Sequence, residues 1–103
     1  METAKFEKLK AIDKLLPGPE MDTTIAAQII KMKSPDDYST LAAASLKVVD
    51  KLNSLGFFVV DGRRGEEEFT CTVVKNGRDL VTSYETTLPM ARCRAALKVI
   101  LED

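Results

Sequence analysis

Residues 57–84 read FFVVDGRRGEEEFTCTVVKNGRDLVTSY, and this stretch decides the fold. It opens with a run of β-favouring residues, and Phe69–Val73 then alternates apolar residues with threonines. Such alternation is typical of a strand with one face toward a core and the other toward solvent or a partner. Asn76-Gly77 lies between two strand candidates, and it is the strongest short hairpin signal because both residues tolerate a positive φ. The stretch therefore predicts an antiparallel sheet.

Composition indicates where the other turn and the third strand lie. Asp61–Gly65 is rich in glycine and is expected to form a flexible hairpin loop with two arginines at its tip. The third strand is expected to run through Leu80, Thr82 and Tyr84. Cys71 falls on the apolar side of the alternating strand, so we expect its thiol to belong to the core.

Helical patterns stand on both sides of the predicted strands. The helix before them is expected to begin at Ser39 or Thr40 as amino-terminal cap and to end at Gly56. Its expected buried side consists of Leu41, Ser45, Val48, Leu52 and Leu55. The helix after them is expected to have Thr87 as its cap and Pro89 in its first turn, where the missing amide proton costs nothing. Its expected buried stripe consists of Met90, Cys93, Leu97, Ile100 and Leu101.

An amino-terminal arm precedes these elements. Apolar residues recur at helical spacing over residues 6–16, and Pro17-Gly18-Pro19 must end this first short helix. A second helix is expected to begin with the carboxylates of Glu20 and Asp22, which complement the exposed amides of a first turn. Its apolar stripe predicts an end near Lys33.

These patterns predict an α+β fold, in which a three-stranded antiparallel sheet packs against helices. We expect residues 1–35 to form a helical arm of two short helices and residues 36–103 to form an α-β-β-β-α domain, the two making a single structural unit. A chain of 103 residues suits one modest core.

No stretch approaches the roughly 20 apolar residues of a membrane span, and the mixed charges of the first eight residues do not resemble a secretory signal. We therefore expect a protein that works inside a cell.

The ionisable residues argue against catalysis. The chain has 15 lysines and arginines against 16 acidic residues, for a formal charge of −1, and it contains no histidine. It thus lacks the usual general base, the commonest zinc ligand and the usual partner of a nucleophilic serine or cysteine. Cys71 and Cys93 are expected to be buried thiols and not a disulfide. We therefore expect that the protein is not an enzyme and that it has no catalytic residue, no metal site and no cofactor.

Three motifs carry a family resemblance. They are Gly18-Pro19-Glu20-Met21-Asp22 before a helix, Tyr38-Ser39-Thr40 at the opening of an alanine-rich helix, and the run LPMARCRAAL at residues 88–97. Together they resemble the phage ABA sandwich domain family, small phage and prophage proteins mostly without assigned function. The similarity spans residues 15–101. The resemblance implies the fold and a phage origin, and hence a location in the cytoplasm of an infected or lysogenic bacterial host. It implies no particular binding site as strongly.

The first functional hypothesis is a binding protein for a small anionic ligand. Such a site needs a few positive side chains, backbone amides and an aromatic surface. The candidate ligand-binding residues are Arg63, Arg64, Arg78, Arg92, Arg94, Tyr38 and Tyr84. The phage resemblance implies that the ligand is a nucleotide signal of host defence, which an anti-defence protein sequesters. We expect a homo-oligomer, a dimer or a higher closed ring.

Two other functions stay open from the sequence. The chain can be an inhibitor or accessory protein that contacts a host protein through its threonine-lined outer sheet face or its alanine-rich helix. Double-stranded RNA binding shares the helix, three strands, helix order, but the last helix offers only Arg92, Arg94 and Lys98, so we expect no nucleic-acid partner. For Arg92 and Arg94 an ordinary solvated or ion-paired face is the alternative to ligand binding.

Overall fold

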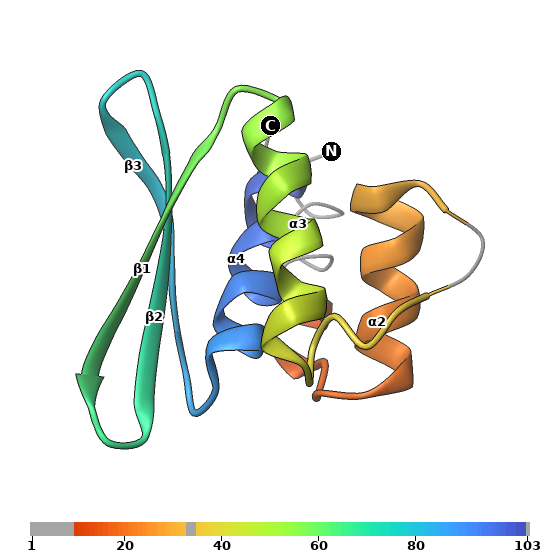
Figure 1. The fold of residues 1–103 in the computed structure, drawn as a ribbon. Helices are drawn as coiled ribbons and strands as arrows, with labels where there is room; N and C mark the ends of the chain where they lie inside the picture. Colours follow the sequence, from red (N-terminus) through yellow and green to blue (C-terminus); the bar gives the residue numbers. More distant parts are fainter. Residues whose placement is uncertain (1–9, 33–34, 103) are drawn as a thin grey trace.

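The structure, a computed structural model, describes residues 10–32 and 35–102, and Figure 1 shows its ribbon. Residues 10–14 are helical, and the elements that follow are α2 (Pro19–Ile25), the π-helix η1 (Ala26–Ile30), α3 (Ala42–Ser54), β1 (Phe58–Gly65), β2 (Glu68–Lys75), β3 (Arg78–Glu85) and α4 (Leu88–Glu102). The strands pair antiparallel in the order β1-β2-β3. The predicted α+β fold, with a three-stranded antiparallel sheet packed against helices, is confirmed.

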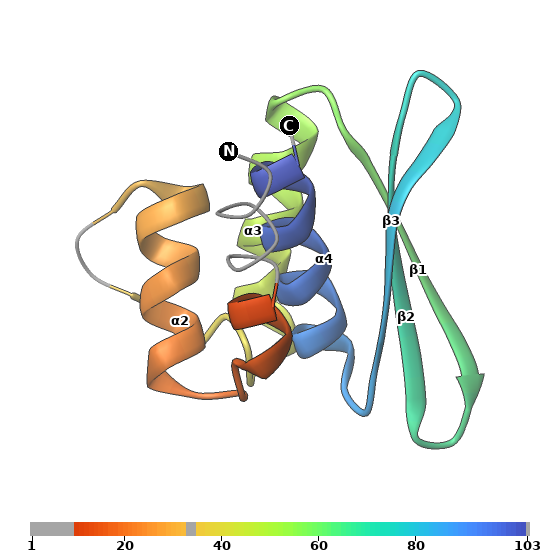
Figure 2. The same ribbon diagram turned by 180° about the vertical axis from the view of Figure 1, so that it is seen from behind.

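The helices form a layer on one face of the sheet (Figure 1, Figure 2). α4 packs directly on β2 and β3, and α3 packs on α4 and on β1. α2 and η1 lie on the far side of this layer, where they contact α3 and α4. In the part of the chain that the structure describes, no helix lies against the other face of the sheet. The sheet therefore has a packed inner face and an open outer face.

α4 is the central element of the core. Every residue from Met90 to Leu97 is buried, because the sheet, α3 and the segment at residues 10–14 surround the helix. The predicted stripe is confirmed as buried at Met90, Cys93 and Leu97, and it is half-buried at Ile100 and Leu101. Three alanines, Ala91, Ala95 and Ala96, are buried between them and let the neighbouring elements approach closely. None of the described helices has the length and hydropathy of a membrane-spanning segment.

The strand pairing decides which side chains face the helices. Asp61 opposes Cys71, and Cys71 in turn opposes Ser83, so these three side chains share one face of the sheet. Cys71 and Ser83 are buried, which identifies this face as the inner one and confirms the predicted core position of Cys71. The neighbouring positions point outward, and they include Phe58, Val60, Thr70, Thr72, Val74, Thr82 and Tyr84.

The expected flexible loop at Asp61–Gly65 is wrong. β1 continues through these residues to Gly65, and the chain turns at residues 66 and 67. Two contacts hold this part of β1 in the sheet: Arg92 binds Asp61, and Thr70 packs over Gly62. A Cβ on Gly62 would lie 2.5 Å from Thr70 Oγ1, so the glycine here permits a close approach between strands.

The second hairpin follows the sequence prediction. Asn76 and Gly77 form the turn with φ values of 55° and 75°. The predicted turn is therefore confirmed, together with the positive φ values on which the prediction depends. β3 runs through Leu80, Thr82 and Tyr84 as expected.

The helix ends agree only in part with expectation. Thr87 caps α4, since its Oγ1 accepts a hydrogen bond of 3.4 Å from the Met90 amide. The expected cap of α3 is wrong, because the cap residue is Leu41 without a side-chain bond, and Leu41 is exposed. Leu55 is also exposed, while Ser45, Val48 and Leu52 are buried as predicted.

The amino-terminal arm is described only from residue 10 onward. The part of the first predicted helix at residues 6–9 lies outside the described residues, as does Lys33, near which the second helix was expected to end. That helix instead closes at Ile30 in a π-helical turn, and Lys31 follows in the left-handed conformation with φ 63°. The division of the chain at residue 35 stays a prediction.

Ser39 joins the segment before α3 to the start of α2 instead of capping α3. Its backbone amide and its hydroxyl both donate to Asp22 Oδ1, at 2.8 and 2.7 Å, and the Gly18 amide donates to Ser39 Oγ at 2.9 Å. Asp22 is buried, so its carboxylate depends on these donors. Gly18 has a φ of 132°, which favours glycine at this position. Two of the motifs behind the family resemblance therefore meet in one buried hydrogen-bond cluster.

We expect Ser39→Ala to lower the free energy of unfolding by about 1–3 kcal/mol, because it leaves the buried Asp22 carboxylate one donor short. Urea denaturation followed by circular dichroism measures the change. Ser54→Ala is the matched control, since the Ser54 hydroxyl also donates a hydrogen bond, to the Lys51 carbonyl, but is exposed, and it should change stability by less than about 0.5 kcal/mol. Equal effects of the two substitutions would contradict the role assigned to Ser39.

Candidate functional site

The outer face of the sheet carries large apolar side chains in contact with solvent. We define this outer face by the outward-pointing residues Phe58, Val60, Thr70, Thr72, Val74, Thr82 and Tyr84. Phe58 is 71% exposed, Val60 57% and Tyr84 52%, although all three stand in regular strands. Contiguous exposed apolar residues on a folded protein commonly mark an interaction site. The outer face is therefore the candidate functional site.

Two of the threonine hydroxyls at the centre of the outer face are paired with each other. Thr72 Oγ1 and Thr82 Oγ1 lie 2.9 Å apart on neighbouring strands, so one hydroxyl donates to the other. The Thr70 hydroxyl packs over the backbone at Gly62. Water can leave a surface at lower cost when its hydroxyls are already hydrogen-bonded to each other. A partner that covers these threonines thus meets mainly methyl groups.

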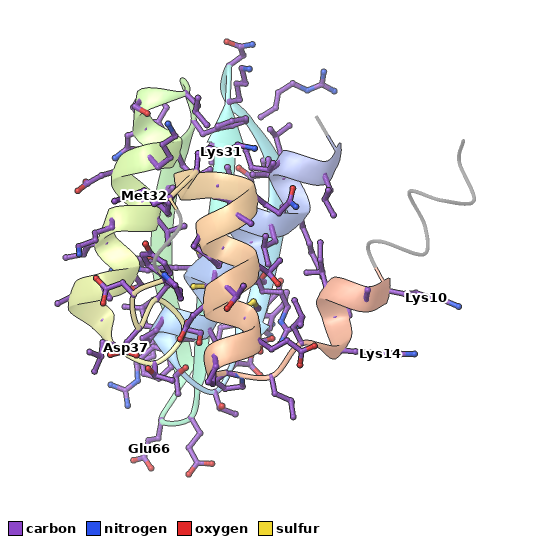
Figure 3. All side chains as sticks on the ribbon, turned by 90° about the vertical axis from the view of Figure 1, so that its right-hand side faces the viewer. Lys10, Lys14, Lys31, Met32, Asp37 and Glu66 are labelled. Atoms are coloured by element: carbon purple, nitrogen blue, oxygen red, sulfur yellow. The ribbon has the colours of Figure 1, made fainter. Side chains whose placement is uncertain are left out.

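Charged residues surround the outer face at the β1–β2 turn. The Arg64 guanidinium lies over the Tyr84 ring, 5.4 Å from its centroid, and Arg64 Nε lies 3.5 Å from Glu68 Oε1. Arg63 folds back on the turn, where its Nε donates to the Gly65 carbonyl at 2.7 Å. Figure 3 shows Glu66 extending away from the tip of this hairpin. Both charge signs are thus present at this end of the face.

The structure divides the seven predicted ligand-binding residues among separate places. Arg63 and Arg64 lie at the β1–β2 turn, and Tyr84 on β3 lies beneath Arg64. Arg78 begins β3 at the other hairpin, which is the opposite end of an antiparallel sheet. Tyr38 is only 2% exposed, so its ring is not available to stack on a ligand. Of the seven, Arg64 and Tyr84 are in direct contact on the open surface.

Arg92 is buried and ion-paired, so it is neither solvated nor open to a ligand, and the ion-paired alternative to ligand binding fits it. Its guanidinium binds Asp61 through two bonds, Nε to Oδ1 at 3.3 Å and Nη2 to Oδ2 at 2.7 Å. Its remaining nitrogen, Nη1, donates to Ser45 Oγ at 2.8 Å and to the Ala42 carbonyl at 3.3 Å. One side chain of α4 therefore holds both β1 and α3.

Arg94 is buried as well, and it holds the amino-terminal segment. Its Nη1 donates to the Ile12 carbonyl, and its Nη2 donates to the Leu15 carbonyl at 2.8 Å and to Glu85 Oε1 at 3.2 Å. Arg92 and Arg94 are each 7% exposed. The double-stranded RNA hypothesis needs these residues on the surface at the start of the last helix, so the structure removes its main support.

Both thiols lie in the core, as expected. Burial, helped by the nearby carboxylate of Asp61 for Cys71 and of Asp22 for Cys93, raises the pKa of each thiol from 9.0 to about 12. Cys93 Sγ also donates to the Tyr38 carbonyl at 3.2 Å. Because the thiolate is the nucleophile, neither sulfur is suited to attack a substrate near neutral pH.

The raised pKa values predict a loss of stability in alkali. The unfolded thiols ionise near pH 9, whereas the folded thiols keep their protons up to about pH 12. The folded state therefore binds more protons in this window, and the stabilisation, complete below pH 9, is lost as the pH rises toward 12. We expect a slope of up to about 1.4 kcal/mol per pH unit for each thiol in urea denaturation. A Cys71→Ala, Cys93→Ala variant with an equally steep slope above pH 9 would contradict this assignment.

Sequence reasoning did not identify Phe58 and Val60 as surface residues. The run Phe57–Val60 is apolar at every position, so it contains no alternation that separates inward from outward residues. Asp61 is the available signal. If its carboxylate faces a buried arginine, Val59 faces the same way, and Val60 and Phe58 face outward. That inference requires knowing the partner, which lies 31 residues away in the sequence.

Comparison with known proteins identifies a solved structure with a similar fold. No protein-family profile and no curated protein matches the chain. The solved structure of a phage protein from Bacillus cereus is similar over 82% of this chain and 93% of that chain, with a TM-score of 0.68 and 20% sequence identity. At this identity the likeness shows a shared fold alone. It fits the phage character implied by the motifs, while membership of the ABA sandwich domain family is not confirmed.

Proposed function

We propose that this chain is a non-enzymatic phage protein that binds a host protein through its outer face, in the cytoplasm of the infected or lysogenic cell. The observation that carries the proposal is the exposure of Phe58 and Val60 on a sheet face that no described helix covers. Large apolar and aromatic side chains at the centre of a contact supply most of its binding energy. The partner is accordingly a protein with an apolar surface of matching shape.

The size of the outer face suits a small interface. Each strand has eight residues, and with a rise of about 3.3 Å and a strand spacing of about 4.8 Å the face measures about 14 by 26 Å. Its projected area of roughly 370 Å² is about half of what one partner contributes to a standard interface. The partner therefore either extends onto the two hairpins or binds in the weaker, transient class.

The buried chemistry supports a binding role over a catalytic one. The two thiols are protonated near neutral pH, and the guanidinium groups of Arg92 and Arg94 bind other parts of the fold. Within residues 10–32 and 35–102, no cluster of cysteine, aspartate and glutamate side chains has the arrangement of a metal site. The groups that remain on the surface are suited to contact.

A second candidate function is sequestration of a small nucleotide signal of host defence. One observation favours it, the pairing of Arg64 with the Tyr84 ring at an end of the outer face. A guanidinium beside an aromatic ring can hold a phosphate and stack a base. In this function Arg63 and Arg64 bind the ligand, whereas in the host-protein function the apolar residues of β1 do.

Site-specific substitution separates the two functions. We expect the double substitution Phe58→Glu, Val60→Glu to weaken binding of the host protein by more than about tenfold, because it places charge in the dehydrated centre of the contact. The partner is first captured in host cells by a photo-crosslinking phenylalanine analogue at position 58, and binding is then measured with purified proteins. Leu46→Glu is the matched control, since Leu46 is exposed on α3, away from the sheet.

The opposite pattern would contradict the host-protein function. Partner binding that survives Phe58→Glu, Val60→Glu but is lost in Leu46→Glu would place the contact on the helical layer. Native mass spectrometry tests the nucleotide function on the same preparation. A retained nucleotide that disappears in Arg63→Ala, Arg64→Ala would support sequestration, and the same spectrum reports how many copies of the chain associate.

A further inference from the structure

A polar cavity opens at the β3 edge of the sheet, where Thr82 and Tyr84 of the outer face form part of its lining. It has a volume of about 380 Å³ and lies where β3, α4 and the helical segment at residues 10–14 meet. Residues 82–85 of β3 line one side, Arg94 and Lys98 of α4 line another, and Asp13 completes the lining. Cavities of this size are at the lower end of the range for small-molecule sites in proteins.

Two residues that line the cavity each have a buried polar atom without a partner. Among the described residues, Ser83 Oγ and Arg94 Nε are the buried side-chain polar atoms that make no hydrogen bond. The Arg94 side chain is 9% exposed and Ser83 is buried, so neither atom is satisfied by bulk water. An unpaired buried donor costs free energy, and such atoms are rare in folded proteins. Their presence together on one cavity indicates a ligand.

The guanidinium of Arg94 is only partly used by its protein partners. Glu85 Oε1 accepts from Nη2 alone, at 3.2 Å, while the neighbouring Nε makes no bond. Nε and Nη2 form one edge of the guanidinium, and an oxyanion at this edge receives two parallel hydrogen bonds. A ligand that displaces Glu85 therefore gains one bond more than the carboxylate makes.

A second cation lies on the same lining. Lys98 Nζ is 2.7 Å from Asp13 Oδ1 and keeps part of its surface exposed. The cavity thus contains two cations, Arg94 and Lys98, and two carboxylates, Asp13 and Glu85. The carboxylates compete with an incoming anion, so each of them weakens binding and each cation strengthens it.

We infer that this cavity binds a small oxyanion, a phosphate or a phosphate ester, which displaces Glu85 and accepts hydrogen bonds from Arg94 Nε and Nη2. Ser83 donates a further bond from its hydroxyl, and Lys98 contributes charge. The cavity exceeds the volume of phosphate itself, so it has room for the organic part of an ester beside Tyr84. The inference does not depend on a protein partner at the outer face.

The test is isothermal titration of the full chain with inorganic phosphate, adenosine 5′-monophosphate and adenosine. Glu85→Gln removes the competing charge and should tighten phosphate binding about tenfold, whereas Lys98→Met should weaken it by a similar factor. Lys47→Met is the matched control, because Lys47 on α3 pairs with Asp36, neither residue lines the cavity, and the substitution should leave the affinity unchanged. Arg94 itself is not substituted, since it also holds the Ile12 and Leu15 carbonyls.

The two sources of the oxyanion give different results. Tighter binding of adenosine 5′-monophosphate than of phosphate supports a phosphate-ester site, and equal binding supports a site for the free ion. Three outcomes would overturn the inference: no binding of either anion at millimolar concentration, adenosine binding as tightly as its monophosphate, or an affinity that Glu85→Gln and Lys98→Met leave unchanged. Loss of host-protein binding at the outer face leaves all these results intact, so the two proposals fail separately.

Discussion

The pairing of Arg92 with Asp61 is the interaction on which the rest of the structure depends. It joins the central helix α4 to the edge strand β1 through two hydrogen bonds, and the same guanidinium donates to Ser45 on α3. The Arg92 side chain is largely buried, so the pair is costly to desolvate and its net contribution to stability is small. Its main effect is on specificity, because a buried guanidinium tolerates only an arrangement that places Asp61 on the inner face.

This constraint determines which apolar residues of β1 reach the solvent. Side chains alternate along a strand, so an inward Asp61 forces Phe58 and Val60 outward and leaves Val59 inward. A slip of one residue would exchange the buried Phe57 and half-buried Val59 for Phe58 and Val60, so burial of apolar area alone does not decide between the two arrangements. The ion pair works against that slip. The exposed surface proposed for binding is thus a direct consequence of a charge in the core.

The parts of the fold that follow local rules could be predicted from the sequence. The alternation of Phe69–Val73, the turn at Asn76-Gly77 and the apolar stripe of the last helix each specify their structure within a few residues. Two of the errors share one cause, a partner that is distant in the sequence. Asp61–Gly65 looks like a loop until Arg92 is placed beside it, and Ser39 looks like a helix cap until Asp22 is placed beside it.

The candidate site was predictable only in outline. Sequence alternation indicated an outer face lined by threonines, but the apolar run Phe57–Val60 gave no means of deciding which residues join them. Arginine content indicated an anion site, but it did not separate exposed Arg64 from Arg92 and Arg94, which hold the fold together. The motifs that resemble a phage family are likewise largely internal, since Gly18, Asp22 and Ser39 bind one another. They report on architecture more than on a site.

Cysteine labelling of β1 tests the central claim most directly. Val59→Cys and Val60→Cys place matched thiols on adjacent residues, while the native thiols of Cys71 and Cys93 stay protonated and buried. The rate of reaction with a maleimide at neutral pH reports the exposure of each new thiol. With Asp61 held by Arg92, the thiol at position 60 should react close to the rate of the unfolded chain and the thiol at position 59 several-fold more slowly. Faster labelling at position 59 than at position 60 would show that β1 presents its other face, and the account would be wrong.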